Sequence, residues 1–113
     1  MIEFDIPGDR QYTIENVVCD FNGTLAVDGA LLPGVAEAKA ELVDRLGAES
    51  TAAIGNGRND FLMLRAAAIG ICVFQREGAY RETLQAADIV CASPVDALEL
   101  LLNPKRLIAT LRR

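Results

Sequence analysis

The 113-residue sequence contains no histidine and no tryptophan, and only three cysteines. Without histidine there can be no Cys–His catalytic pair and no imidazole ligand, and no two cysteines have the CxxC spacing of a thiolate zinc site. A metal bound here must therefore be a hard cation held by oxygen ligands. No apolar run approaches the roughly 18–20 residues that span a bilayer, so we expect no membrane partner.

The cysteines, Cys19, Cys72 and Cys91, all fall inside apolar, strand-like runs. An odd number of cysteines spread through core segments argues against a disulfide framework and favours a reducing cytoplasm. We interpret all three as buried structural thiols. The first residues lack the basic region and apolar stretch of a signal peptide, which also favours a cytoplasmic location.

Basic residues are scarce outside the C-terminal end. Residues 1–104 hold all sixteen acidic residues but only seven basic ones, and Lys39 is the one lysine among them. With a net charge of −5, the chain has a poor surface for nucleic acid, and we expect no such partner. The basic residues at 105–113 are interpreted as a solvated helix end that complements its own dipole.

The pattern of apolar residues predicts one α/β domain over residues 1–113, because strands separated by single helices imply right-handed parallel crossovers. The expected elements are a hairpin of strands 2–6 and 12–19, a loop at 23–33 with a small flap, a helix at 34–46, a strand at 51–54, a helix at 60–68, a strand at 71–74, a helix at 80–87, a strand at 88–91, and a helix from 94 that breaks at Asn103-Pro104 before a final amphipathic turn.

The most informative stretch is residues 17–25, VVCDFNGTL. An apolar run ends abruptly in Asp20, which places this carboxylate at the carboxyl end of a strand, where open α/β sheets hold their reactive groups. Gly23 lets the backbone turn and bring amides close to an anion. The alternative is an ordinary turn after a core strand.

A second motif follows the strand at 51–54. Residues 55–60, GNGRND, precede a helical stretch that begins at Phe61. The motif thus also lies at the end of a strand that we expect to be parallel to the first.

Together the two motifs resemble the haloacid dehalogenase (HAD) superfamily, whose first motif is DxDGT in phosphatases and DKTGT in P-type ATPases, and whose fourth is GDGxND. Neither motif here has the usual phosphatase carboxylate, so the chain is most similar to the soluble P-type-ATPase-like branch. The resemblance covers most of residues 12–102. It implies a shortened HAD/Rossmann-like parallel sheet flanked by helices, with an N-terminal β-hairpin and no cap domain.

The resemblance also implies roles for individual residues. Asp20 would be the nucleophile that accepts a phosphoryl group from a small phosphorylated substrate, and Lys39 would be the third-motif lysine. The alternative for Lys39 is an exposed helix lysine near Glu41 and Asp44. The implied phosphate-binding residues are Gly23, Thr24 and Gly57, and the implied ligands of a weakly bound Mg²⁺ are Asp20, the Asn22 carbonyl, Asn56 (or Asn59) and Asp60.

The sequence departs from the family in ways that bear on catalysis. Asn22 replaces the acid–base aspartate, which contributes on the order of 10²–10⁴ in rate, and Asn56 replaces the first acid of the fourth motif. The second motif is absent, as if two strand–helix units were deleted between Val35 and Ala36. Two functions remain open: a slow HAD-like phosphohydrolase or phosphoryl acceptor, and a catalytically degenerate binding or oligomerisation module. A dinucleotide-binding unit is a weaker match, because residues 55–57 lack the third glycine and the downstream acid of that fingerprint.

The missing units also predict assembly. Without them the strand at 12–19 has an unpaired edge, which the short, charged strand at 2–6 cannot fully cover. We therefore expect a homo-oligomer that buries this side, on the order of 800 Å² or more per partner.

Overall fold

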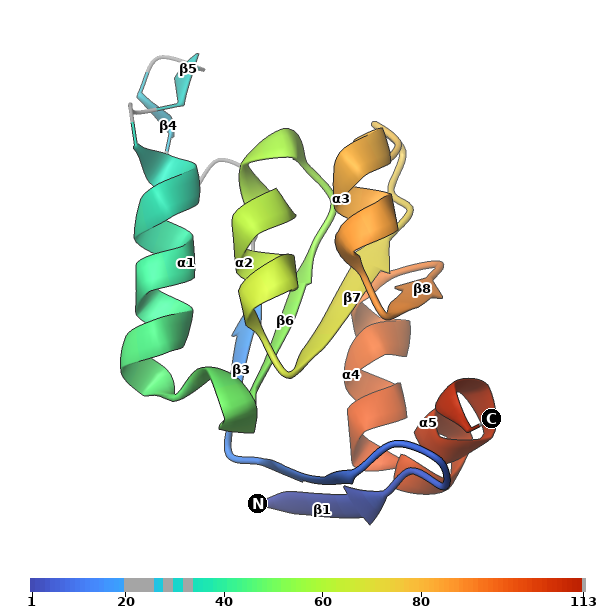
Figure 1. Ribbon diagram of the computed structural model, residues 1–113. Helices are drawn as coiled ribbons and strands as arrows, with labels where there is room; N and C mark the ends of the chain where they lie inside the picture. The colour runs from blue at the N-terminus through green and yellow to red at the C-terminus, as the bar shows by residue number, and fades with distance from the viewer. Residues whose placement is uncertain (20–25, 28–29, 32–33, 113) are drawn as a thin grey trace.

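A four-stranded parallel sheet forms the centre of the molecule in the computed structural model, which describes residues 1–19, 26–27, 30–31 and 34–112 (Figure 1). The strands lie in the order β3-β6-β7-β8. Their bounds are β3 Asn16–Cys19, β6 Thr51–Gly55, β7 Ile69–Val73 and β8 Ile89–Cys91. With helices on both faces and an N-terminal antiparallel hairpin, this arrangement confirms the α/β class predicted from the sequence.

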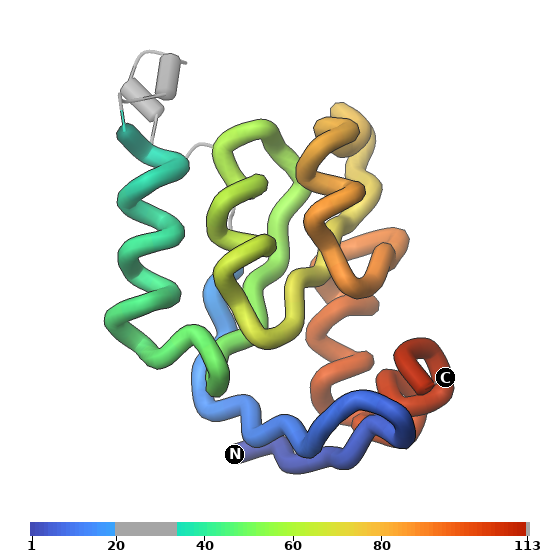
Figure 2. Tube along the Cα trace, in the orientation of Figure 1, coloured from blue at the N-terminus to red at the C-terminus, as the bar shows by residue number. Residues whose placement is uncertain are grey.

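The helices divide between the two faces of the sheet. In Figure 1, α1 (Val35–Leu46), α2 (Phe61–Ala66) and α3 (Arg81–Ala86) stand in front of it, and α4 (Pro94–Leu102) lies behind. The hairpin of β1 (Ile2–Asp5) and β2 (Gln11–Ile14) packs against α5 (Pro104–Leu111) below the amino ends of the strands, and Figure 2 shows both termini there. A second, two-stranded hairpin joins β4 (Ala26–Val27) and β5 (Ala30–Leu31). None of the helices in the described ranges is long and apolar enough to cross a bilayer.

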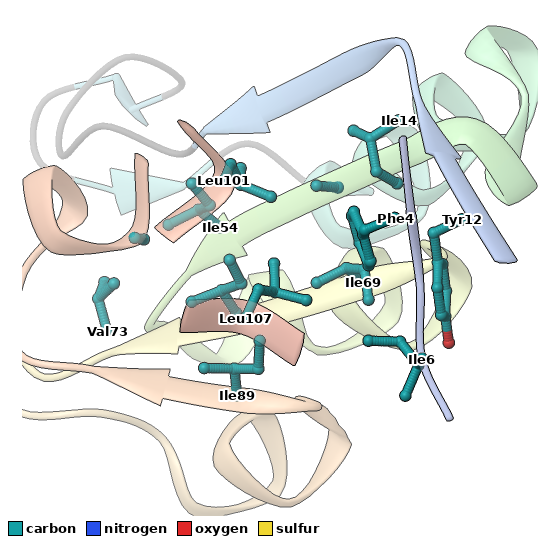
Figure 3. Packing of buried hydrophobic residues seen from close by; sticks show 13 residues of the cluster. Phe4, Ile6, Tyr12, Ile14, Ile54, Ile69, Val73, Ile89, Leu101 and Leu107 are labelled. Carbon is teal, nitrogen blue, oxygen red and sulfur yellow. The ribbon is translucent and has the colours of Figure 1, made fainter. Parts of the chain in front are cut away.

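The core has two parts because the central strands β6 and β7 are buried on both faces, as strands of a parallel sheet are. In front, Val43 of α1 packs with Met63 and Leu64 of α2. Behind, a larger cluster joins the sheet to α4, α5 and the N-terminal hairpin, as Figure 3 shows. Its residues include Phe4, Ile6, Ile14, Ile54, Ile71, Leu101 and Leu107.

The predicted strand at 12–19 is wrong in one respect: it is two strands in two sheets. β2 pairs with β1, whereas β3 pairs with β6, and the chain turns between them at Glu15, whose amide donates to the Ser50 carbonyl at 2.8 Å. The physical reason is that Ile14 packs into the cluster behind and below the sheet, beside the hairpin residues Phe4 and Tyr12. β1 therefore does not lie along the edge of the main sheet.

Two predicted boundaries also shift around Gly70. The predicted helix at 60–68 ends at Ala66, and the strand expected to start at 71 starts at Ile69. A Cβ on Gly70 would lie 2.6 Å from the carbonyl oxygen of Leu64. The glycine thus lets the strand pass directly beneath α2. The end of the helix could not be located from the sequence, because it lies within a continuous apolar run.

β3 is an edge strand of the sheet in the described part of the chain. Its Val17 is 41% exposed, on the face that it shares with Cys19 because strand side chains alternate. On α4, Val95, Leu98 and Leu102 are also exposed, and their spacing places them on one side of that helix. These residues are consistent with the predicted homo-oligomer, which stays a prediction.

Substitution at this edge tests the oligomer. We expect Val17→Lys to shift the protein to monomer, because a lysine on an edge strand opposes strand-to-strand association. Light scattering coupled to size exclusion at tens of micromolar measures the mass. Val90→Lys, on the exposed side chain of the opposite edge strand β8, is the matched control and should leave the mass unchanged. A monomeric native chain would contradict the prediction.

Candidate functional site

The strand that leads into the first motif and the loop of the second motif lie next to each other at the carboxyl end of the sheet. In the parallel pairing of β3 with β6, Cys19 lies beside Ile54, so β3 ends next to the loop that begins after Gly55. The predicted site residues Asp20, Asn22, Gly23 and Thr24 follow β3 directly and lie outside the described residues. The structure brings the other four, Lys39, Asn56, Gly57 and Asp60, together at this end of β6.

Asp60 is the centre of this group and is fully buried. Its Oδ2 accepts hydrogen bonds from the backbone amides of Asn56 and Gly57, both at 3.0 Å. Its Oδ1 accepts one from the Lys39 ammonium at 2.8 Å. Position 55 requires glycine, because a Cβ there would lie 2.5 Å from the Asp60 carboxyl carbon. The loop therefore folds around one carboxylate.

Lys39 reaches this carboxylate from α1 and is only 7% exposed. Its Nζ also donates to Oδ1 of Asn59 at 3.3 Å. The alternative of an exposed lysine near Glu41 is thus wrong, and Glu41 instead pairs with Arg45 on the surface of α1. The helix places Lys39 inward because Val35 and Val43, four residues to either side, are also buried.

Asn56 is held by the loop after β7. Its Nδ2 donates to the Glu77 carboxylate at 3.1 Å and to the Gly78 carbonyl at 2.9 Å. Because both partners are acceptors, the amide must point its Nδ2 toward them, and Oδ1 is then the acceptor atom on the other side of the side chain. The backbone carbonyl of Asn56 accepts from the Tyr80 amide at 2.8 Å.

One supporting residue, Thr83 on α3, was not predicted from the sequence. It is fully buried, and its hydroxyl donates to the Gly57 carbonyl at 2.7 Å. A threonine within a helical stretch gives no signal of such a contact, since the partner lies 26 residues away in the sequence. The close contact at Gly55 could have been predicted from the sequence, because a glycine at the end of a buried strand indicates close approach of another group.

Mg²⁺ requires charged and neutral oxygens with free lone pairs, and the donor set meets this requirement only in part. The Asp60 carboxylate already accepts three hydrogen bonds, one of them from an ammonium group that would repel a dication. These contacts favour a role for Asp60 in ordering the loop and holding Lys39, rather than in binding a metal. Asn56 Oδ1 is a neutral oxygen of the kind that magnesium accepts. No cluster of three His, Cys, Asp or Glu side chains occurs among the described residues.

The cysteines near the site are unactivated thiols. Burial raises the pKa of Cys72, and the negative charge of Asp60 raises it further. Burial likewise raises the pKa of Cys19, the last residue of β3. Both groups therefore stay protonated at neutral pH and are poor nucleophiles. The prediction of three buried thiols is confirmed for Cys72 alone, because Cys19 and Cys91 are only partly buried in strands at the two edges of the sheet.

Comparisons with known proteins give partial matches. No family model matches the chain. An uncharacterized protein of Methanocaldococcus jannaschii, MJ0073, is 55% identical over 60 residues, which are 53% of this chain and 64% of that protein. The chain thus matches less than two thirds of the length of this relative.

Solved structures match over 64% of this chain and 27% of their own length, each with a TM-score of 0.43. One, at 32% identity, is the HAD subclass IIB sugar phosphatase BT4131. Another, at 30%, is a hypothetical protein from Geobacillus kaustophilus, and a third, at 32%, comes from work on a trigonal-bipyramidal intermediate in a phosphoryl-transfer superfamily. Their low TM-scores leave the function of this chain to be inferred from its own residues.

The buried ion pair can be tested by its effect on stability. Asp60→Asn should lower the free energy of unfolding by about 3 kcal/mol or more, since it leaves a buried ammonium facing an amide. Lys39→Met should cost less, because Asp60 keeps its two backbone amides. Denaturant unfolding of both single variants and the double variant measures the coupling, which we expect at about 0.5–3 kcal/mol.

Arg45→Met is the matched control for this cycle. It removes an exposed pair on the same helix, with Glu41, and should change stability little. Additive effects of Lys39→Met and Asp60→Asn would contradict a specific interaction between the two side chains.

Proposed function

We propose that this chain is a HAD-like phosphohydrolase or phosphoryl-acceptor domain of the soluble P-type-ATPase-like type, with Asp20 as its nucleophile. The observation that carries the proposal is the buried Lys39–Asp60 pair, which holds an ammonium group at the carboxyl end of β6, beside the strand that leads into Asp20. For packing alone, an apolar side chain would serve as well as this buried ion pair. The ammonium group is suited to an anionic substrate.

In the proposed reaction, a carboxylate oxygen of Asp20 attacks the phosphorus of a phosphomonoester. A bond forms between Asp20 and phosphorus while the bond to the ester oxygen breaks, and the leaving oxygen takes its proton from water. Asn22 cannot supply that proton, so turnover is slow. Water then hydrolyses the aspartyl phosphate, which releases phosphate and restores Asp20.

Lys39 has two roles in this proposal. Its ammonium offsets the charge that builds up on the phosphoryl oxygens, and Asp60 keeps it in one orientation. The amides of Asn56 and Gly57 are taken by Asp60, so we assign Gly57 to loop geometry as well as to the predicted phosphate cradle with Gly23 and Thr24.

Magnesium would be held by Asp20, the Asn22 carbonyl and Asn56 Oδ1. When bound, it would neutralise charge on the phosphate. With a single carboxylate in this set, the affinity is expected to be weak.

Hydrolysis of a generic aryl phosphate tests the nucleophile and the missing acid. Asn22→Asp should raise the rate more than about tenfold, and Asp20→Asn should abolish it. Asn103→Asp, between α4 and α5, controls for the added charge and should have no effect. If both the native chain and Asn22→Asp match buffer, the chain is a degenerate binding module instead.

Titration calorimetry with Mg²⁺ tests the proposed ligand Asn56. Asn56→Asp alone should disturb the loop, because its carboxylate would face Glu77 and the Gly78 carbonyl in place of two hydrogen bonds. In a Glu77→Gln background, the new glutamine can donate to the introduced carboxylate, and we expect magnesium to bind roughly tenfold tighter than in Glu77→Gln alone. Equal affinity in those two proteins, or an affinity unaffected by Asp20→Ala, would contradict this placement.

A further inference from the structure

A groove of about 550 Å³ lies beside the candidate site, over the ends of α1, α2 and α3. This volume is in the range of small-molecule sites. Its apolar lining comes from Ala36 on α1 and from Phe61 and Leu62 at the start of α2. Neither the sheet nor the buried ion pair requires an apolar hollow here, so the groove is a candidate ligand site.

The groove and the candidate site have Asn59 in common. This residue lines the groove, and its Oδ1 accepts a hydrogen bond from Lys39 at 3.3 Å. A phosphate held by Lys39 would therefore direct its organic group into or along the groove. Arg58 also lines the groove, and its guanidinium lies 5.5 Å from the centre of the Tyr80 ring, which adds a second cation to the site.

The lining indicates the chemistry of that organic group. An apolar wall with an aromatic ring favours a flat apolar group, whereas the hydroxyls of a sugar would each need a hydrogen-bond partner. Glu82 is the one acid among the described lining residues, and it disfavours a second anionic group on the ligand.

The chemistry at residue 22 points independently to the same class. An alkoxide leaves a phosphate with difficulty unless an acid protonates it, and Asn22 is no acid. A phenolic oxygen has a pKa of about 10 and departs more readily without a proton. A site that lacks the general acid is therefore best matched to aryl esters.

We propose that the groove binds the uncharged aromatic leaving group of a small aryl phosphate monoester whose phosphate faces Lys39. This proposal rests on the proposed function for the orientation of the ligand. Binding to the groove can nevertheless be measured without turnover.

Phosphonates that cannot be hydrolysed provide the probe. Calorimetry on the native chain with Mg²⁺ should give phenylphosphonate an affinity about tenfold or more above that of methylphosphonate, because the ring is buried. In amide NMR spectra, phenylphosphonate should shift residues 58–62 and 80–82. Equal affinities, no binding of either probe, or shifts elsewhere would overturn the proposal.

Leu62→Ser should reduce the preference for phenylphosphonate severalfold, and Leu98→Ser, on α4 behind the sheet, is the matched control that should leave it intact. Ala36→Phe, which fills the groove from α1, is a second variant should Leu62→Ser fail to fold. An unchanged preference in a folded groove variant would also overturn the proposal.

Kinetics separate this proposal from the proposed function. We expect Leu62→Ser to lower kcat/KM for phenyl phosphate but not for an alkyl phosphate. Preferential phenylphosphonate binding without any hydrolysis would support the groove and contradict the phosphohydrolase. Hydrolysis of phenyl phosphate with equal kcat/KM in Leu62→Ser and the native chain would support the phosphohydrolase and contradict the groove proposal.

Discussion

The candidate site depends on one buried carboxylate. Asp60 accepts from two backbone amides of its own loop and from the Lys39 ammonium, and it fills the space that a side chain on Gly55 would need. A buried charge is tolerated only where such partners satisfy it. The loop at the end of β6, the position of α1 and the orientation of Lys39 are therefore coupled to each other.

Other elements reinforce this centre from outside. Thr83 ties α3 to the Gly57 carbonyl, and Glu77 with Gly78 holds the Asn56 side chain. The same helices form the apolar groove next to Asn59, so a polar end and an apolar end lie side by side. We infer that the first receives the phosphate and the second the organic group, in a site that relies on the leaving group where a general acid is missing.

The order of the elements and the position of both motifs were predictable from the sequence. Buried parallel strands such as β6 are largely apolar runs, and Gly47 and Pro94 mark the end of α1 and the start of α4. The break at Glu15 was not predicted from the sequence, because the change of sheet depends on where Ile14 packs in the tertiary structure. The early start of β7 was missed because residues 66–69 are all apolar and give no sign of where the helix ends and the strand begins.

The sequence by itself determined the chemistry available: no histidine, oxygen ligands alone for a metal, two loops after two parallel strands, and asparagine at positions 22 and 56. Only the tertiary structure decided how the described side chains are used. Lys39 was equally compatible with an exposed helix face, and its burial follows from the packing of α1 against α2 and the loop of Asp60. The partners of the Asn56 side chain and of the Gly57 carbonyl lie more than twenty residues away, and contacts of that range exist only once the helices pack on the sheet.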